Sequence, residues 1–331
     1  MERVSQCIQL YPDTFDLFKI INIQLSSPVT ELLMAVLKGR LNYTLSLTIN
    51  EFKYPREGIE FAVELIKSSH NLKAFNWKDN QMGSTENGRY LVDAITNHPS
   101  INHVQLENCL AGINGYDAIK SLFTTKKHFS YIDLENNNMQ TGGNTEIPDF
   151  IARNTPTTEL YLGGNNLNDN DASLIAQALK QNTNLQHLDL QSNDLSVVGK
   201  KVLFNAIYDP TNLNTLSVCN HTCRLYLGLN LGERLDMENT SDKPRYNRSK
   251  KISHLLSIRN KEGSIVQHFN EEFGDEDDDS LKLVPKVLER ISQLDKIEGR
   301  CSLSIMYEIL RGWKMPELYD TKRGQEKTNR Y

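Results

Sequence analysis

The stretch from Asn184 to Leu195 reads NLQHLDLQSNDL and carries a spaced pattern of apolar residues. The pattern is L-x-x-L-x-L-x-x-N-x-L, formed by Leu185, Leu188, Leu190, Asn193 and Leu195. It recurs when the window is moved along the chain by 28 residues, or by 29 or 30 near the N-terminus. Seven copies in nearly constant register indicate an internal repeat, and they begin at Asn42, Leu72, Ile101, Phe129, Thr157, Leu185 and Leu213.

The residues that follow each copy have a different period, which predicts a helix. Leu174, Ile175, Ala178 and Leu179 have the spacing of one helical face. Related sets recur at Ala118, Ile119, Leu122 and Phe123, and at Val202, Leu203, Ala206 and Ile207. Asp169 or Asp171 and Ser196 are the predicted N-caps. Each unit therefore predicts a strand, a turn and a helix.

A unit of this length with a full helix resembles the ribonuclease-inhibitor type of leucine-rich repeat, over Asn42 to Cys223. The resemblance implies an α/β fold, a right-handed solenoid with a parallel concave sheet, convex helices and helical caps. One strand–helix unit cannot bury its apolar face alone, so units stack on a shared core. We expect an N-terminal cap over 1–41, repeats over 42–224 and a C-terminal helical cap with an acidic loop and polar tail over 225–331.

The two predicted caps contain further local signals. Thr30 to Gly39 has the composition of a helix with a glycine stop, and Ile21, Ile23 and Leu25 could form a degenerate strand before it. The acidic run from Glu271 to Asp279 is typical of a solvated loop. Around it, KKISHLLSIRNKEG, LKLVPKVLERIS and LSIMYEILRGWKMPELYD resemble the tail of uncharacterised diatom leucine-rich-repeat proteins. This resemblance implies an ordered end cap and no activity.

The repeated asparagine falls where each strand is expected to turn away. An amide side chain there can bond to backbone groups that the sheet no longer pairs. We therefore predict a structural asparagine ladder, made of Asn50, Asn80, Asn137, Asn165 and Asn193.

Composition narrows the classes of function. The net charge is −5 over 331 residues, which argues against a general nucleic-acid binder. No apolar run approaches the ~18 residues of a membrane span, and the first residues lack the features of a signal peptide. Five scattered cysteines suggest free thiols in a reducing compartment. We expect a cytoplasmic protein, with a nuclear location open because residues 243–251 are basic.

Two patterns could suggest a metal site, and both depart from the required chemistry. Asp275, Asp277 and Asp279 alternate as at the start of a calcium loop, but Ser280 and Lys286 replace the required glycine and glutamate. The stretch from Cys219 to Cys223 contains two thiols and one imidazole without a second ligand pair nearby. No catalytic constellation is evident, so we expect no enzyme activity, no cofactor and no metal.

The remaining candidate for function is the predicted concave face. Alternate strand residues point to it, including Thr215, Ser217 and Cys219 in the last copy. Acids and tyrosines on this face favour a basic protein partner rather than a small molecule, a nucleic acid or a membrane. The predicted partner-binding residues are Glu107, Tyr131, Asp133, Glu135, Glu159, Tyr161 and Asp189.

Two classes of function fit these features. The first is a non-enzymatic protein-interaction module, by analogy from repeat architecture. The alternative is a GTPase activator similar to the Ran GTPase-activating protein, which also has this repeat type and an acidic segment near its C-terminus. Here further predicted helices follow the acidic run, and asparagine recurs at the repeat turns, so no single position matches a catalytic asparagine.

Overall fold

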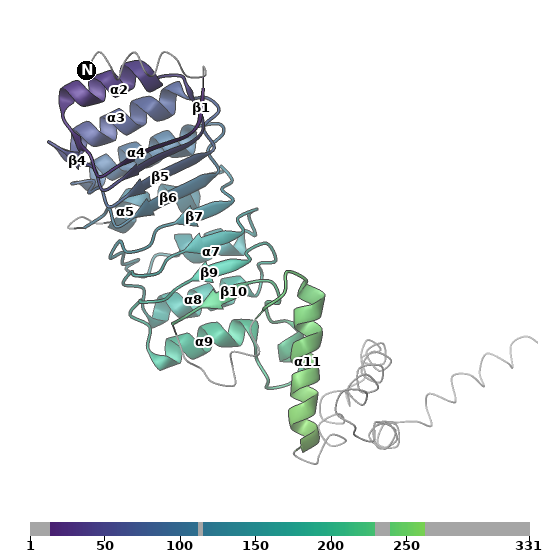
Figure 1. The fold of residues 1–331 in the computed structure, drawn as a ribbon. Coiled ribbons are helices and arrows are strands. Elements are labelled where there is room, and N and C mark those ends of the chain that lie inside the picture. The colour runs from purple at the N-terminus through teal and green to yellow at the C-terminus, as the bar shows by residue number, and fades with distance from the viewer. Residues whose placement is uncertain (1–13, 112–114, 229–238, 262–331) are drawn as a thin grey trace, which may run out of the picture. The chain divides into compact units, whose positions relative to one another are not determined.

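The computed structural model describes residues 14–111, 115–228 and 239–261 (Figure 1). The chain divides into two compact units. The first consists of Met1–Tyr208 with Cys219–Asn247, and the second of Asp209–Val218 with Arg248–Tyr331. All strands described below belong to the first unit.

An eight-stranded sheet runs through the first unit, and every neighbouring pair of its strands is parallel. The strands follow one another across the sheet in the order of the sequence. They are β1 (Phe15–Ile21), β3 (Leu41–Thr48), β5 (Ala74–Lys78), β6 (His103–Glu107), β7 (Tyr131–Asp133), β8 (Glu159–Tyr161), β9 (His187–Asp189) and β10 (Arg224–Tyr226). Strands β2 (Gln24–Leu25) and β4 (Glu51–Phe52) form a second, small parallel sheet. The predicted α/β fold with a parallel sheet is confirmed.

Helices connect these strands and stand beside the sheet as a second layer (Figure 1). They are α2 (Ser27–Leu37), α3 (Pro55–Ser68), α4 (Thr85–Asn97), α5 (Gly115–Ile119), α6 (Ser121–Thr124), α7 (Glu146–Ala152), α8 (Asp169–Leu179) and α9 (Val197–Ile207). Ser196 caps α9 as predicted, since its side chain accepts from the backbone of Val198 and Gly199. Neither Asp169 nor Asp171 is the N-cap of α8, so that prediction is wrong: Asn168 is the cap, and Asp171 completes a capping box with it.

The core lies between the sheet and the helices. Alternate strand residues such as Phe75, Trp77, Leu188 and Leu190 are almost fully buried. Trp77 stacks on Phe52 of β4 with ring centroids 5.8 Å apart. The residues that alternate with the buried ones, such as Asn76 and Asp189, are more exposed. They therefore lie on the face of the sheet that the helices leave uncovered.

The structure corrects the predicted ends of the repeat array. At the N-terminus, β1 pairs with β3 in the register Phe18↔Leu45 and Ile20↔Leu47, so the sheet begins within the segment assigned to a cap. The predicted seventh strand is wrong. Its residues 213–217 form helix α10 (Leu213–Ser217), and the strand beside β9 is β10, in the register Leu225↔Leu188. Helix α11 (Pro244–Lys261) follows.

The backbone repeats one unusual conformation where each strand ends. The residue just before each ladder position has a positive φ, which L side chains rarely adopt. Asparagine, aspartate, serine and glycine fill most of these positions, and isoleucine fills one: Asn22, Ile49, Asp79, Asn108, Asn136, Gly164 and Ser192. Ile49 is the exception, because a β-branched side chain is strained at its φ of 52°.

Replacing Ile49 by asparagine is expected to stabilise the fold by about 1 kcal/mol, because asparagine tolerates the left-handed region at lower cost. Half of the Ile49 side chain is exposed, so little apolar burial is lost. Chemical denaturation of both proteins measures the difference. Ile21→Asn is the matched control, since Ile21 is as exposed but has no positive φ. A stabilisation of similar size in that control would contradict the backbone explanation.

The ladder asparagines all make the same kind of contact. Each Nδ2 donates to a backbone carbonyl at the end of the preceding strand, and each Oδ1 accepts a backbone N–H of the preceding unit. In Asn165 these groups are Leu134 O at 3.0 Å and Met139 N at 3.0 Å. Cys109 stands in the ladder between Asn80 and Asn137. The bonds connect successive strands at the point where strand pairing ends.

A second set of side-chain bonds joins successive strand–helix repeats at the opposite end of the strands. Asn182 donates to Ile151 O at 2.7 Å and accepts from the N–H groups of Asn184 and Leu185. Asn220 repeats this pattern toward Leu179 O, and a histidine, His98, repeats it toward Ser69 O at 2.9 Å. Burial lowers the pKa of His98, which suits a neutral ring whose Nδ1 accepts these bonds.

Candidate functional site

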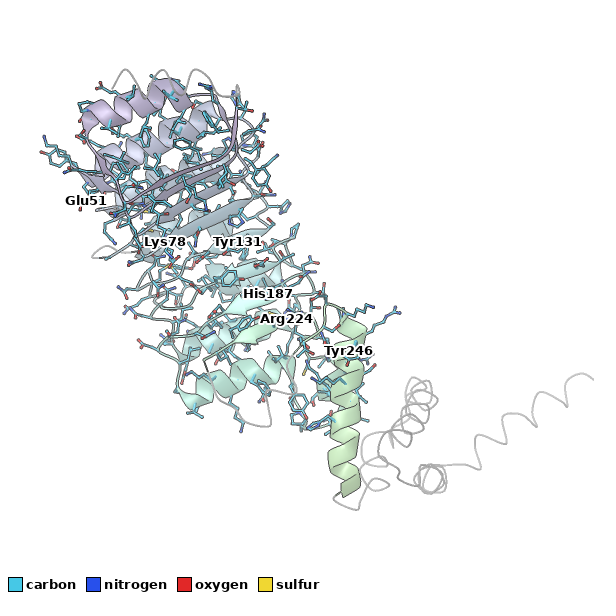
Figure 2. All side chains as sticks on the ribbon, in the orientation of Figure 1. Glu51, Lys78, Tyr131, His187, Arg224 and Tyr246 are labelled. Atoms are coloured by element: carbon cyan, nitrogen blue, oxygen red, sulfur yellow. The ribbon has the colours of Figure 1, made fainter. Side chains whose placement is uncertain are left out.

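The candidate site is the uncovered face of the sheet from β6 to β10, here called the open face. Figure 2 labels Tyr131, His187 and Arg224, which follow one another along the sheet on this face. The strand register places its side chains in adjacent rows. The open face comprises His103, Gln105, Glu107, Tyr131, Asp133, Glu135, Glu159, Tyr161, His187, Asp189, Arg224 and Tyr226.

Each strand from β6 to β10 contributes one aromatic ring to the open face. His103 stacks on Tyr131 with centroids 3.9 Å apart and an interplanar angle of 6°. Tyr131 lies 5.3 Å from Tyr161, and His187 stacks on Tyr226 at 6.2 Å. Neighbouring parallel strands lie ~4.8 Å apart, so rings on successive strands can touch. These contacts join the rings into two groups on the open face, one of three rings on β6 to β8 and one of two rings on β9 and β10.

The tyrosine hydroxyls are tied to carboxylates, which fixes the rings in place. Tyr161 Oη donates to Glu159 Oε2 at 2.8 Å, and Tyr131 Oη donates to Asp133 Oδ2 at 3.3 Å. Burial raises the pKa of both phenols, and the acids beside them raise it further. Both tyrosines therefore remain neutral hydrogen-bond donors at ordinary pH.

The acids of the open face differ in how far their charge is compensated. Glu107 forms an ion pair with Lys78 at 2.9 Å, and the bond raises the pKa of that lysine. Asp133 is only 4% exposed and accepts from Glu135 N at 3.0 Å and Gln105 Nε2 at 2.9 Å. Burial and the charge of Glu107 raise the pKa of Asp133. These two carboxylates are therefore largely committed to contacts within the protein.

Asp133, one of the predicted partner-binding residues, is buried and does not face water. It lies beneath its neighbours and holds a backbone N–H, Gln105 and Tyr131 together. A substitution there would disturb the sheet as well as the surface. Glu135, Glu159 and Asp189 are the accessible acids of the predicted set, together with the rings of Tyr131 and Tyr161.

Carboxylate oxygens of Glu135 and Asp189 lie close to Gly163, which follows β8, and leave little room over it. A Cβ on Gly163 would lie 3.2 Å from Asp189 Oδ1 and 3.3 Å from Glu135 Oε1. Asp189 Oδ1 accepts from Gln191 N at 2.8 Å, whereas no described residue donates to the Glu135 carboxylate. Burial raises the pKa of Glu135 to about 7, and the nearby charges of Asp133 and Asp189 contribute.

Several open-face residues escaped the sequence analysis. The rings of His103 and His187 lie on the open face but are not among the predicted partner-binding residues. Tyr226 and Arg224 were missed because the last strand was placed at residues 213–223. Their signal was present as Leu225 and Leu227, which repeat the spacing of Leu188 and Leu190. Arg224 pairs with Asp242 at 2.7 Å.

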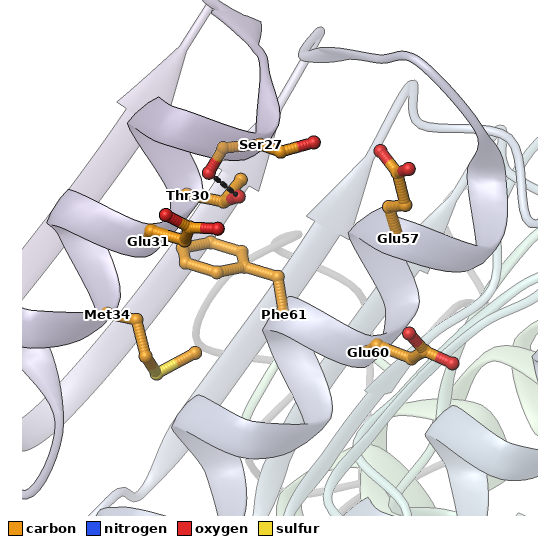
Figure 3. A pocket seen from close by; sticks show the side chains of 7 residues that line it. All are labelled: Ser27, Thr30, Glu31, Met34, Glu57, Glu60 and Phe61. Carbon is orange, nitrogen blue, oxygen red and sulfur yellow. Dashed lines mark hydrogen bonds between the residues drawn. The ribbon is translucent and has the colours of Figure 1, made fainter.

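A groove between helices α2 and α3 is a second candidate, with a volume of about 320 Å³ (Figure 3). Phe61 and Met34 form its apolar part, and Glu31, Glu57 and Glu60 border it. Figure 3 shows the bond from Thr30 Oγ1 to the Ser27 carbonyl, 2.9 Å long, at one end. Arg56 neutralises Glu60 at 2.7 Å. The groove has no set of converging polar groups that would orient a ligand.

In the described ranges 14–111, 115–228 and 239–261, no group of three or more histidines, cysteines or acids is arranged to hold a metal ion. Cys219 and Cys223 are buried thiols whose sulfurs contact Asn205 O and Arg224 O. Cys223 lies directly before β10. The calcium-like aspartates at 275–279 lie outside the described residues, as do the helices expected after them.

Comparison with known proteins adds no family assignment. No protein-family model matches the chain, and no match was found among curated proteins. No helix within the described ranges is both long and apolar enough to span a bilayer. Function must therefore be argued from the open face itself.

Proposed function

We propose that this protein is a non-enzymatic interaction module that binds a basic protein partner on the open face. The observation that carries this proposal is the alignment of one ring per strand over β6 to β10 with the accessible acids Glu135, Glu159 and Asp189. Rings bury a large area at low entropic cost and are common interface anchors. Carboxylates steer a partner of opposite charge.

We further propose that the first unit is a right-handed leucine-rich-repeat solenoid of the ribonuclease-inhibitor type. Three features support this: parallel strands in chain order, a helix or a pair of short helices between most successive strands, and two ladders that connect neighbouring units. Solenoids commonly bind through the face formed by their strands. Such a face extends a flat array of side chains, which suits a protein surface better than a small molecule.

Capture from a lysate of the source cell with wild-type protein and with Glu159→Lys tests the proposal. Partners should be retained by the wild type and lost from the variant, because the substitution reverses one accessible charge beside Tyr161. The retained proteins should carry a surplus of lysine and arginine. Glu86→Lys, on the exposed surface of α4, is the control with the same change in net charge.

Two results would contradict the proposal. Equal retention by both variants would place the contact away from the open face. Faster phosphate release from a panel of small GTPases in the presence of the protein would show that it is a GTPase activator instead.

A further inference from the structure

Strand β1 forms one edge of the eight-stranded sheet, and no described strand pairs with its outer side. Asn22 N donates to Thr48 O of β3 at 3.0 Å, so the β1 residues two and four positions earlier also turn their backbone groups toward β3. Leu17, Lys19 and Ile21 alternate with these residues and turn their N–H and C=O groups outward. A free edge of this kind is a template for pairing with another strand.

The side chains along this edge are apolar and exposed. Leu17 is 56% exposed and Ile21 is 52% exposed, and Ile23, two residues further on, is 46% exposed. Soluble proteins commonly protect a free strand edge with charged side chains. Within β1, Lys19 is the one base and Asp16 the one acid, so the strand carries no net charge. The edge therefore lacks the charge that would keep a second strand away.

Helix α2 leaves apolar surface at the same end of the first unit (Figure 1). Its sequence is mostly apolar, yet only Leu37 is fully buried, whereas the next helix, α3, buries seven of its residues. The apolar side chains of α2 that remain partly exposed are Val29, Leu32, Leu33, Met34 and Val36. In repeat proteins a polar cap normally covers the end of the shared core. Here the outermost described strand and helix both leave apolar groups uncovered.

We propose that this end of the sheet is a dimer interface, in which β1 pairs with β1 of a second copy of the chain. A two-fold axis perpendicular to the sheet makes the two strands antiparallel, the arrangement in which a strand pairs with itself. The same axis keeps the helices of both copies on one side of the joined sheet, so α2 meets α2 of the second copy. The exposed apolar groups of each copy are thereby covered by those of the other.

The sequence of β1 suits pairing with itself. When Phe18 lies opposite Phe18 of the second copy, Leu17 lies opposite Lys19, and the two Lys19 side chains are not directly opposed. This register also keeps the buried and the exposed side chains of both strands on matching faces. Residues 15–37, which include β1 and α2, are comparable in number to one side of a standard interface, roughly 20–30 residues. The edge therefore offers a self-complementary surface of sufficient size.

Sedimentation velocity on the full chain, from about 1 µM to about 100 µM, tests the proposal. Wild-type protein should change from monomer to dimer over this range. Leu17→Lys should raise the dissociation constant about tenfold or more, because the new ammonium group lies opposite Lys19 of the second copy. Val198→Lys is the matched control, since Val198 is an exposed apolar residue on α9, and it should dimerise as the wild type does.

A proline at position 19 tests the backbone pairing directly. The N–H group of Lys19 points away from β3, so Lys19→Pro removes a donor of the free edge without breaking a bond inside the sheet. Lys19→Ala loses the same charge and keeps the N–H group. The proline variant should dimerise about tenfold more weakly than the alanine variant. Thermal melting establishes that each variant is folded, and if Lys19→Pro does not fold, Leu17→Lys decides the question.

Amide exchange followed by NMR distinguishes strand pairing from contact through α2 alone. The amide protons of Leu17, Lys19 and Ile21 should exchange more slowly at high protein concentration, because pairing gives their N–H groups an acceptor. The amide of Asn22 already donates to Thr48 O, so its exchange should depend less on concentration. Equal concentration dependence at the two kinds of position would contradict pairing through β1.

Two further results would overturn the proposal. A wild-type chain that stays monomeric at about 100 µM would show that the edge does not bind a second copy. If Leu17→Lys also lowered the melting temperature of that monomer, the occupant of the edge would be residues 1–13 of the same chain. A dimer that neither Leu17→Lys nor Lys19→Pro weakens would place the contact elsewhere on the molecule.

Discussion

Replacing Asn165 by alanine is expected to destabilise the first unit by roughly 3–5 kcal/mol. Its side chain accepts from the backbone N–H groups of Asn137 and Met139 and donates to three backbone carbonyls. The substitution removes the acceptor of the two backbone N–H groups, whereas each of the three carbonyls keeps a second donor. Each buried group left unsatisfied costs ~1–3 kcal/mol. Urea unfolding followed by circular dichroism measures the change.

The adjacent residue provides the matched control. Asn166 carries the same side chain, but its amide makes one bond, to Asn138 O at 3.1 Å, at an exposed position. Asn166→Ala should cost less than about 1 kcal/mol. Similar losses of unfolding free energy in the two variants would mean that the buried asparagine ladder does not hold successive strand–helix repeats together.

Leu188→Ala should cost about 2–5 kcal/mol, the range for truncating a buried leucine. Leu188 is the central residue of β9 and is fully buried between strands that pair on both sides. The cavity cannot be filled by the neighbouring strands without breaking their register. Val198→Ala, on the exposed surface of α9, is the control and should change stability by less than about 0.5 kcal/mol. A loss below ~1 kcal/mol for Leu188→Ala would place this residue outside the core.

The regular part of the fold follows from the sequence because its signals are local and repeated. Strands β3 to β9 and the helices between them lie close to the predicted positions, since each unit imposes the same spacing of apolar residues. Both ends were harder to predict. Strand β1 lacks a polar ladder residue, since Ile23 takes that position. Before β10, extra residues interrupt the 28-residue repeat. Continuing the repeat at a constant spacing therefore predicts a strand where the structure has helix α10.

The candidate site was predictable as a face but not as a set of interactions. Alternation assigns Glu107, Asp133 and Glu135 to one side of the sheet, and all three carry the same formal charge in the sequence. The structure makes them different: Lys78 pairs with the first, the second is buried, and the third is without a donor among the described residues. Such differences depend on contacts between strands that lie about 28 residues apart, so no local pattern carries them.

The ladder bonds also determine how the first unit opens under thermal fluctuation. Each bond joins one strand–helix repeat to the next. A repeat in the middle of the sheet must therefore break two sets of bonds to open, whereas a repeat at either end breaks one. Local opening therefore begins at the ends, where β1 has a strand on one side only. Strands β7 and β8, which carry Tyr131 and Tyr161, lie well inside the sheet. We therefore expect slow amide-proton exchange in these two strands, which would keep the rings of Tyr131 and Tyr161 in position before binding.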